Sequence, residues 1–230
     1  MSAASSKTQA ILSHLPLFNT MTDEELARIV QRTRELNLAR GAIVFQKGDP
    51  SNGFYLVVHG QVKLALPSAN GSEKVVEIIN AGQSFGEAVM FMEKPYPVYA
   101  QALNDSLLLH IAKAAVFEEI GRDAGFCRKM LAGLSLRLHG LVQDVEAYTL
   151  RSSTQRLIGY LLQNDLHGEA ENGPATLSLP AGKAVIASRL NLTPETFSRI
   201  LHNLSSEGLI SVDGRNVTVS DVAALRVYDR

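Results

Sequence analysis

The chain has 230 residues, of which 46% are hydrophobic and 20% are charged, and its formal net charge is −1. These values suit an ordinary water-soluble protein of two modest domains, and the apolar runs fall far short of the roughly 20 residues that span a bilayer. The single cysteine, Cys127, excludes an internal disulfide framework and an all-cysteine zinc or iron–sulfur site within one chain. The opening "MSAASSKTQA" lacks the apolar core of a signal peptide, so we expect a loose tail on a cytoplasmic protein.

The first half of the chain is predicted to place helices before a β-rich domain. Residues 8–36 have a helical pattern, in which Thr22 is the expected cap and acidic residues follow it. From about 42 to 112 short β-rich runs alternate with turn clusters, which favours an antiparallel barrel or jelly roll. The runs are "AIVFQ", "GFYLVV", "QVKLAL", "KVVEII" and "SLLLHI". Six glycines are expected mostly at its corners, where a positive φ is needed: Gly41, Gly48, Gly60, Gly71, Gly82 and Gly86.

A long helix is predicted over about 125–149, and its apolar residues repeat at intervals of four and three. This a/d seam is typical of a two-stranded coiled coil and consists of Cys127, Leu131, Leu134, Leu138, Leu141, Val145 and Tyr148. The alternative is an amphipathic helix that packs on its own domain. We favour a partner chain because the stripe is narrow and because Phe126, Met130 and Val142 offer a second edge for the barrel.

The remaining residues predict a second domain with a helix-turn-helix and a wing. A helix over 151–165 is followed by a polar loop (166–174), the strand "ATLSL" and the helix "GKAVIASRL". Asn191 suits a left-handed turn, after which Thr193 and Pro194 start a second helix that ends at Gly208. A hairpin with Asp213–Gly214 as its turn completes an arrangement that is used to bind DNA.

The second helix of such a unit enters the major groove with its N-terminal residues against the bases. Arg199 can then bond guanine O6 and N7, Glu195 can accept from cytosine N4, and Ser198 can bond a base or a phosphate. Thr193 and Thr196 suit phosphate contacts. The alternative is a solvated first turn with an ion pair between Glu195 and Arg199. The predicted DNA-binding residues are Thr193, Glu195, Thr196, Ser198, Arg199 and His202.

Four segments, in this order, resemble the CRP/FNR superfamily of transcription regulators: "LPLFNTMTDEEL", "GDPSNGFYLVVHGQVKL", "FGEAVMF" and "LTPETFSRILHNLSSEGLI". The resemblance implies an α+β fold with a sensor barrel of the cyclic-nucleotide-binding jelly-roll type (1–124), a dimerisation helix (125–149) and a C-terminal winged helix-turn-helix (150–230). It also implies a homodimer that binds double-stranded DNA and contacts RNA polymerase, activation being the family norm. The spacing of Glu195, Ser198 and Arg199 resembles the FNR/Dnr branch, which reads TTGAT-type half-sites.

Two departures restrict the expected signal. Cyclic-nucleotide members hold the phosphate with an arginine and a serine or threonine shortly after F-G-E, where this chain has Val98 and Tyr99, so cAMP is not expected. FNR's iron–sulfur cluster needs several cysteines, and this chain has one. The segment "FGEAVMFMEKPY" most resembles the Dnr-type nitric oxide regulators, which are associated with haem. The predicted effector residues are Phe85, Gly86, Glu87, Val89, Met90, Phe91 and Met92, and His14 is the first candidate for the haem ligand.

Two rival classes of function stay open. A cupin-like metal enzyme needs clustered ligands, whereas the six histidines (14, 59, 110, 139, 167 and 202) are scattered singly. A regulator of the same fold could instead sense a phosphate-bearing anion through other residues.

Overall fold

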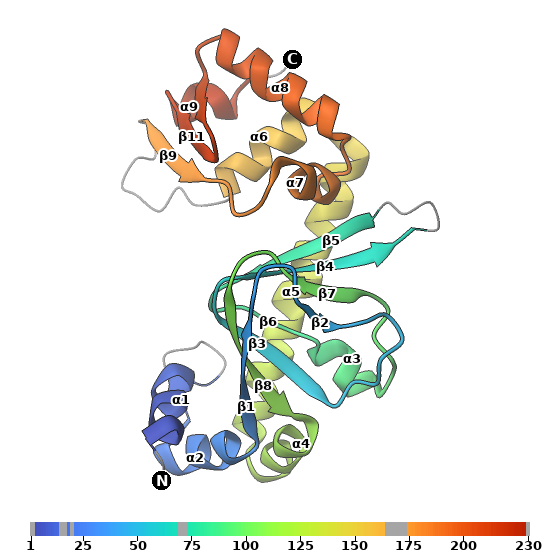
Figure 1. The fold of residues 1–230 in the computed structure, drawn as a ribbon, viewed down its shortest axis with the longest axis vertical. Helices are drawn as coiled ribbons and strands as arrows, with labels where there is room; N and C mark the ends of the chain where they lie inside the picture. The colour runs from blue at the N-terminus through green and yellow to red at the C-terminus, as the bar shows by residue number, and fades with distance from the viewer. Residues whose placement is uncertain (1–2, 14–17, 19–20, 69–72, 164–173, 229–230) are drawn as a thin grey trace. The chain divides into compact units, whose positions relative to one another are not determined.

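The computed structural model describes residues 3–13, 18, 21–68, 73–163 and 174–228, and its helices and strands are labelled in Figure 1. The chain divides into two compact units, one of residues 1–72 and 76–140 and the other of residues 73–75 and 141–230. Among the described residues, no helix is both long enough and apolar enough to cross a membrane.

Two helices precede the sheets. α1 (Ala3–Ser13) occupies most of the segment that was expected to be a loose tail, and that expectation is wrong because α1 buries Leu12 in the core. α2 (Asp23–Gln31) begins with the predicted Thr22 cap, and Thr22 and Glu25 form a reciprocal capping box. The helical prediction up to residue 36 is also wrong. Residues from Thr33 onward form the strand β1 (Thr33–Leu38) because they pair with a strand more than 60 residues later in the chain.

The first unit is built on two four-stranded sheets with antiparallel pairs. One sheet has the order β1-β8-β3-β6 and the other has the order β2-β7-β4-β5. Their strands are β2 (Ile43–Phe45), β3 (Gly53–His59), β4 (Gln61–Pro67), β5 (Glu73–Asn80), β6 (Ser84–Phe85), β7 (Tyr99–Ala102) and β8 (Ser106–Ala112). All five predicted runs are therefore strands. Five of the six predicted glycines, all except Gly71, have a positive φ, and Gly71 lies outside the described residues.

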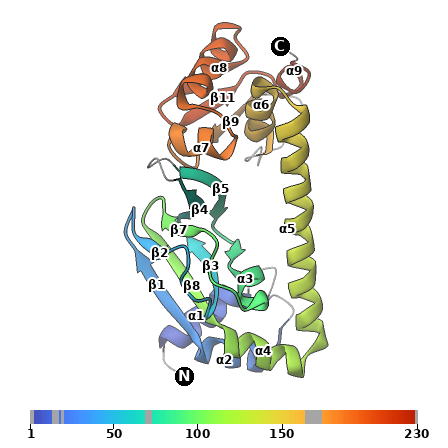
Figure 2. The same ribbon diagram turned by 90° about the vertical axis from the view of Figure 1, so that its right-hand side faces the viewer.

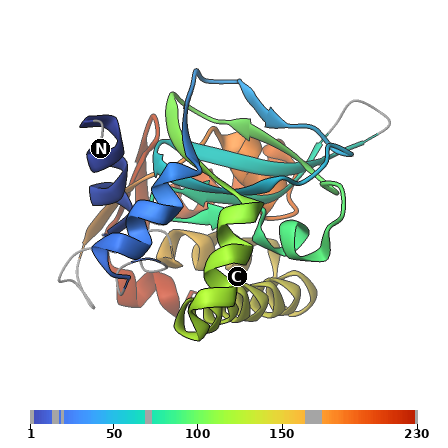
Figure 3. The same ribbon diagram turned by 90° about the horizontal axis from the view of Figure 1, so that it is seen from below.

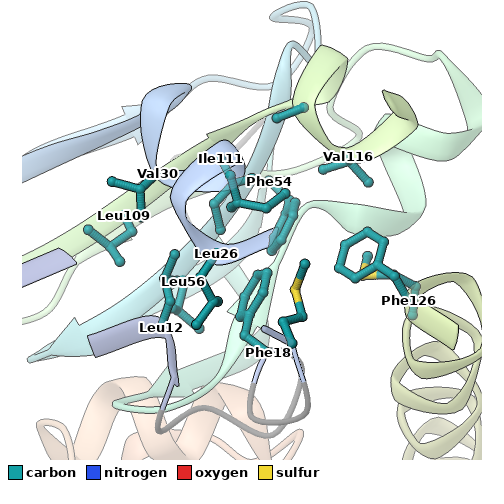
Figure 4. Packing of buried hydrophobic residues seen from close by; sticks show 14 of the residues in the cluster. Leu12, Phe18, Leu26, Val30, Phe54, Leu56, Leu109, Ile111, Val116 and Phe126 are labelled. Carbon is teal, nitrogen blue, oxygen red and sulfur yellow. The ribbon is translucent and has the colours of Figure 1, made fainter. Parts of the chain in front are cut away.

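Alternation along β3 and β8 supplies two hydrophobic clusters, one on each face of the first sheet. The inner cluster contains Leu108 and Val57, together with Phe45, Phe85 and Tyr96 from other strands and loops. The outer cluster contains Leu109 and Phe54 and is covered by α1, α2 and the start of the long helix. Figure 4 shows this outer cluster, where the rings of Phe18 and Phe126 meet with 6.3 Å between their centroids.

Three further helices contribute to the first unit, and the last of them continues into the second unit from residue 141. α3 (Glu87–Met92) follows Gly86, and α4 (Lys113–Arg122) leads into α5 (Ala124–Leu150), which is one continuous helix (Figure 2). α1, α2 and α4 gather at one end of the sheets (Figures 1 and 3). Phe126 and Met130 of α5 are buried as expected, but Val142 is 59% exposed. The predicted second apolar edge therefore stops at Met130, the last residue of α5 in the outer cluster.

The second unit holds α6 (Ser153–Gln163), β9 (Ala175–Ser178), α7 (Lys183–Arg189), α8 (Pro194–Ser206), β10 (Ile210–Asp213), β11 (Asn216–Val219) and α9 (Val222–Arg226). Its three strands have the order β10-β11-β9. The predicted loop at 166–174 lies outside the described residues except for its last residue. The hairpin turn differs from the prediction: Asp213 pairs with Asn216, so the turn residues are Gly214 and Arg215. Only Gly214 has a positive φ (59°), which matches a type II′ turn with glycine at its first central position.

Candidate nucleic-acid interface

α7 and α8 form the predicted helix-turn-helix. Asn191 has a φ of 57°, and the N–H of Leu192 donates to the carbonyl of Ala187 at 2.9 Å, which closes the end of α7. Thr193 then caps α8 by accepting from the N–H of Thr196, and Pro194 occupies the first turn, where a missing N–H costs nothing. The tight turn therefore fixes the direction in which α8 starts.

α8 has one buried face and one exposed face. The buried face holds Phe197, Ile200, Leu201 and Leu204, which fixes the rotation of the helix about its own axis. Five of the exposed side chains lie at the intervals of three and four residues that form one stripe along the helix: Glu195, Ser198, Arg199, His202 and Asn203. Four of the six predicted DNA-binding residues therefore share one solvent-facing stripe. Asn203 was not predicted, although the same spacing could have indicated it.

The two threonines of the first turn have different surroundings from those expected. The Thr193 hydroxyl accepts from the Thr196 N–H at 3.2 Å and donates to the Thr196 Oγ1 at 3.1 Å. Because a hydroxyl has one proton, Thr193 has none left for a phosphate in this arrangement. Thr196, which accepts from Thr193, keeps its own hydroxyl proton for a further acceptor.

Glu195 and Arg199 do not form the ion pair that was the alternative interpretation. The pKa of Glu195 lies below its ordinary value, chiefly because its carboxylate accepts from its own backbone N–H. Within the part of the chain that the structure describes, Arg199 forms no ion pair. Its guanidinium is exposed and keeps its donors for a ligand, and the Glu195 carboxylate is exposed and has further acceptor sites for a base.

Arg215 is a second exposed cation that the sequence interpretation missed. It lies at the tip of the β10–β11 hairpin, and its carbonyl accepts from the N–H of Leu179 at 2.8 Å. This hydrogen bond fixes its backbone to the chain just after β9. Arg215 was not predicted as an exposed tip residue because the predicted turn at Asp213–Gly214 placed it inside the following strand.

The predicted dimerisation seam on α5 is mostly exposed in the single chain. Leu131 and Leu138 are 57% and 64% exposed, and Leu141 and Val145 are also exposed. Cys127 and Leu134 are half-buried, and the side chain of Tyr148 lies outside the described part. A row of large apolar side chains in water is unfavourable unless another surface covers it. The exposed apolar row of α5 can accommodate the apolar face of a second helix.

The seven predicted effector residues do not converge on one cavity. Phe85 and Val89 contribute to the inner cluster, whereas Met90 and Phe91 contribute to the outer one. Glu87 is buried, Gly86 is the left-handed residue before α3, and Met92 is 55% exposed. Helix geometry explains this divergence, because side chains two positions apart, such as those of Val89 and Phe91, point to opposite sides of α3.

Of the histidines that the structure describes, His110 has the most structured surroundings. It lies opposite Arg34 and Tyr55 in neighbouring strands, and its ring centroid is 4.9 Å from that of Tyr55. Burial, together with the charge of Arg34, lowers its pKa, so the neutral imidazole is favoured. His59 and His139 are exposed, and His14 lies outside the described residues.

Comparisons with known proteins agree with this architecture. Residues 35–123 match the cyclic nucleotide-binding domain, and residues 155–228 match the Crp-like helix-turn-helix domain. The anaerobic regulatory protein of Pasteurella multocida is 25% identical over 93% of this chain and 79% of its own length.

Solved structures are similar over a comparable span. The crystal structure of DNR from Pseudomonas aeruginosa is 34% identical, with 96% of this chain and 97% of that chain covered and a TM-score of 0.51. FixK2 from Bradyrhizobium japonicum is 20% identical and shares the fold, with 86% and 98% covered and a TM-score of 0.75. With a cyclic-nucleotide-binding type of barrel and a Crp-like helix-turn-helix in one chain, the protein is a transcription regulator rather than an enzyme, and it belongs to the CRP/FNR family.

Proposed function

We propose that the protein is a homodimeric regulator that binds a palindromic DNA operator with TTGAT-like half-sites. One observation carries the proposal: the exposed polar stripe of α8 lies opposite a fully apolar buried face and starts directly after the tight turn. A recognition helix needs this division, since its buried face holds it rigid while its exposed face meets base edges.

In this proposal the side chains of α8 and of the wing divide the contacts between bases and phosphates. Arg199 donates bidentately to guanine O6 and N7, and Glu195 accepts from a cytosine N4 amine. Thr196 donates its hydroxyl proton to a phosphate, while Thr193 holds that hydroxyl in place. Arg215 adds a phosphate contact from the wing, which supplies affinity without base selection.

Base selection by Arg199 is the sharpest test. Arg199→Ala should weaken operator binding by about 1–3 kcal/mol and relax selection at one base pair in each half-site. Arg199→Lys is the matched variant, because it keeps the charge and loses the planar fork. Binding should be measured by fluorescence anisotropy on operators that differ at each position. Equal weakening on every operator would assign Arg199 to a phosphate and contradict this role.

The dimer supplies the symmetry of the operator. If the α5 seams of two chains pack together, two copies of α8 can reach half-sites about one helical turn apart, ~34 Å. We further propose that the bound dimer contacts RNA polymerase and activates transcription. In vitro transcription with purified polymerase tests this step, and operator binding without a change in transcript would contradict it.

For the signal, we propose nitric oxide acting through haem. Support comes from the resemblance of "FGEAVMFMEKPY" to Dnr-type regulators and from the 34% identity with DNR. The described residues do not bring an apolar cleft and a histidine together, because the effector residues diverge and His59, His110 and His139 lie on separate elements.

A titration of the apo-protein with hemin, followed by operator binding with and without nitric oxide, tests the signal. A Soret shift with a change in operator affinity would support it. Without a Soret shift, calorimetry with cyclic nucleotides tests the alternative of a phosphate-bearing anion, and heat of binding there would replace the haem proposal.

A further inference from the structure

An ion pair between a buried carboxylate and a partly exposed arginine links α2 to α4 in the first unit. The Arg28 guanidinium donates to the Glu119 carboxylate through Nε to Oε1 at 2.7 Å and through Nη2 to Oε2 at 3.1 Å. The Glu119 side chain is only 2% exposed, and Arg122 approaches its Oε1 at 3.3 Å. A bidentate pair of this kind fixes both distance and orientation, so α2 and α4 are held in one arrangement.

The pair is obligatory for Glu119 because its carboxylate is out of water. Its pKa lies below the ordinary range, since the hydrogen bond from Arg28 outweighs the opposing effect of burial. Removal of Arg28 would leave the buried carboxylate with only the longer contact from Arg122 among the described residues, which compensates its burial less well. Arg32, the residue that follows α2, pairs with Glu118 of α4 at 2.6 Å, but both side chains are nearly half exposed, so this pair contributes little. It provides a matched control.

The end of α4 determines where α5 begins. The N–H of Asp123 donates to the Glu119 carbonyl at 2.8 Å. The Asp123 carboxylate accepts from the N–H groups of Gly125 and Phe126 at 2.8 Å each. Phe126 and Met130 are then buried in the outer cluster, whereas the next residue, Leu131, is 57% exposed. α5 is thus attached to the sensor core through its first two turns. These turns follow the end of α4, the helix in which Arg28 binds Glu119.

We propose that Arg28 and Glu119 are positioning residues that hold the start of α5 on the sensor domain and thereby set the operator affinity of the dimer. The effect on operator affinity rests on the proposed DNA-binding function, while the attachment of α5 does not. A helix whose described fully buried residues all lie in its first two turns can change direction if α4 moves. Loosening the pair lets α5 sample more orientations, and fewer molecules are then ready to bind both half-sites.

The test compares full-length Glu119→Gln with Glu118→Gln, using hydrogen exchange of the amides at 124–131 and operator binding. At a temperature where both variants stay folded, Glu119→Gln should speed exchange in this segment by about tenfold or more relative to strands β3 and β8. Its operator affinity should fall by about threefold or more. Glu118→Gln should match the wild type in both measurements.

Two further variants keep the result decisive if Glu119→Gln fails to fold. Arg28→Lys keeps the charge but loses the fork, and it should show a smaller change in the same direction. The reversed pair, Arg28→Glu with Glu119→Arg, should restore part of the exchange protection. A uniform rise in exchange over the whole unit, or an operator affinity equal to that of Glu118→Gln, would overturn the proposal. If the wild type does not bind operator, the proposed function fails, and the exchange comparison still decides whether the pair holds α5.

Discussion

Leu138→Glu tests whether the exposed stripe of α5 is a dimer seam. Leu138 is 64% exposed in the single chain, so the substitution should change the stability of the folded protomer by no more than about 0.5 kcal/mol. In the dimer the same side chain would be covered by its counterpart. A charged carboxylate would then lie in an apolar interface, where it has no partner of opposite charge on the seam.

The magnitude follows from the exposed fraction. Full burial of a leucine contributes about 1.5–3 kcal/mol, so burial of the 64% that is still exposed contributes about 1–2 kcal/mol. Two copies per dimer give about 2–4 kcal/mol, which is about 30-fold to 900-fold in the dimer dissociation constant. The cost of burying two carboxylates makes this a lower limit.

Sedimentation equilibrium measures the dimer constant, and fluorescence anisotropy measures operator binding on the same samples. The control is Ala132→Glu, which adds the same charge to the same helix at an exposed position outside the seam. Leu138→Glu should give a monomer with poor operator affinity, while Ala132→Glu should remain a dimer. A dimer constant unchanged by Leu138→Glu would refute the assignment of the seam.

Three further predictions address other parts of the molecule. Phe126→Ala should lower the free energy of unfolding by about 3–5 kcal/mol in denaturant titrations, because this ring is fully buried against Phe18; a loss below about 1 kcal/mol would contradict its place in the core. Because burial lowers the pKa of His110 in the folded state, the stability that its neutral form contributes is complete above about pH 6.5 and is lost as the pH falls through the lowered value. Urea titrations at pH 7.5 and pH 5 should therefore show a smaller pH dependence for His110→Gln than for the wild type or the exposed control His59→Gln, and equal dependence would exclude this role. Arg215→Ala should weaken binding equally on all operator sequences and reduce the slope of log affinity against log salt by about 1, whereas an unchanged slope would place Arg215 off the DNA.

Features set by neighbouring residues were predictable from the sequence. Thr193, Pro194 and Gly208 define the ends of α8 because capping and chain reversal depend on side chains within a few positions. The five predicted strands share this local character, with apolar runs between turn clusters. The polar stripe of α8 also followed directly from spacing, since helical periodicity determines which side chains share a face.

Features set by distant residues were not predictable in the same way. β1 has few β-branched or aromatic residues and is a strand because it pairs with β8. The hairpin register depends on β9 as well as on the turn, since Leu179 bonds the Arg215 carbonyl. The predicted effector residues were grouped because they are close in sequence, but their side chains pack into both the inner and the outer cluster. The Arg28–Glu119 pair joins residues 91 positions apart, and no local pattern marks it.

The α5 seam and the α8 stripe depend on each other for a quantitative reason. If Glu195, Ser198 and Arg199 each discriminate by about 1–3 kcal/mol, one recognition helix provides about 3–9 kcal/mol under the best alignment. Regulators need about 4–10 kcal/mol of preference over non-specific DNA, so a single helix can fall below the required range and does not reach its upper end. A second copy, held at a fixed spacing by α5, doubles the number of base contacts without a new surface. Loss of the seam should therefore reduce operator preference even when every side chain of α8 is intact.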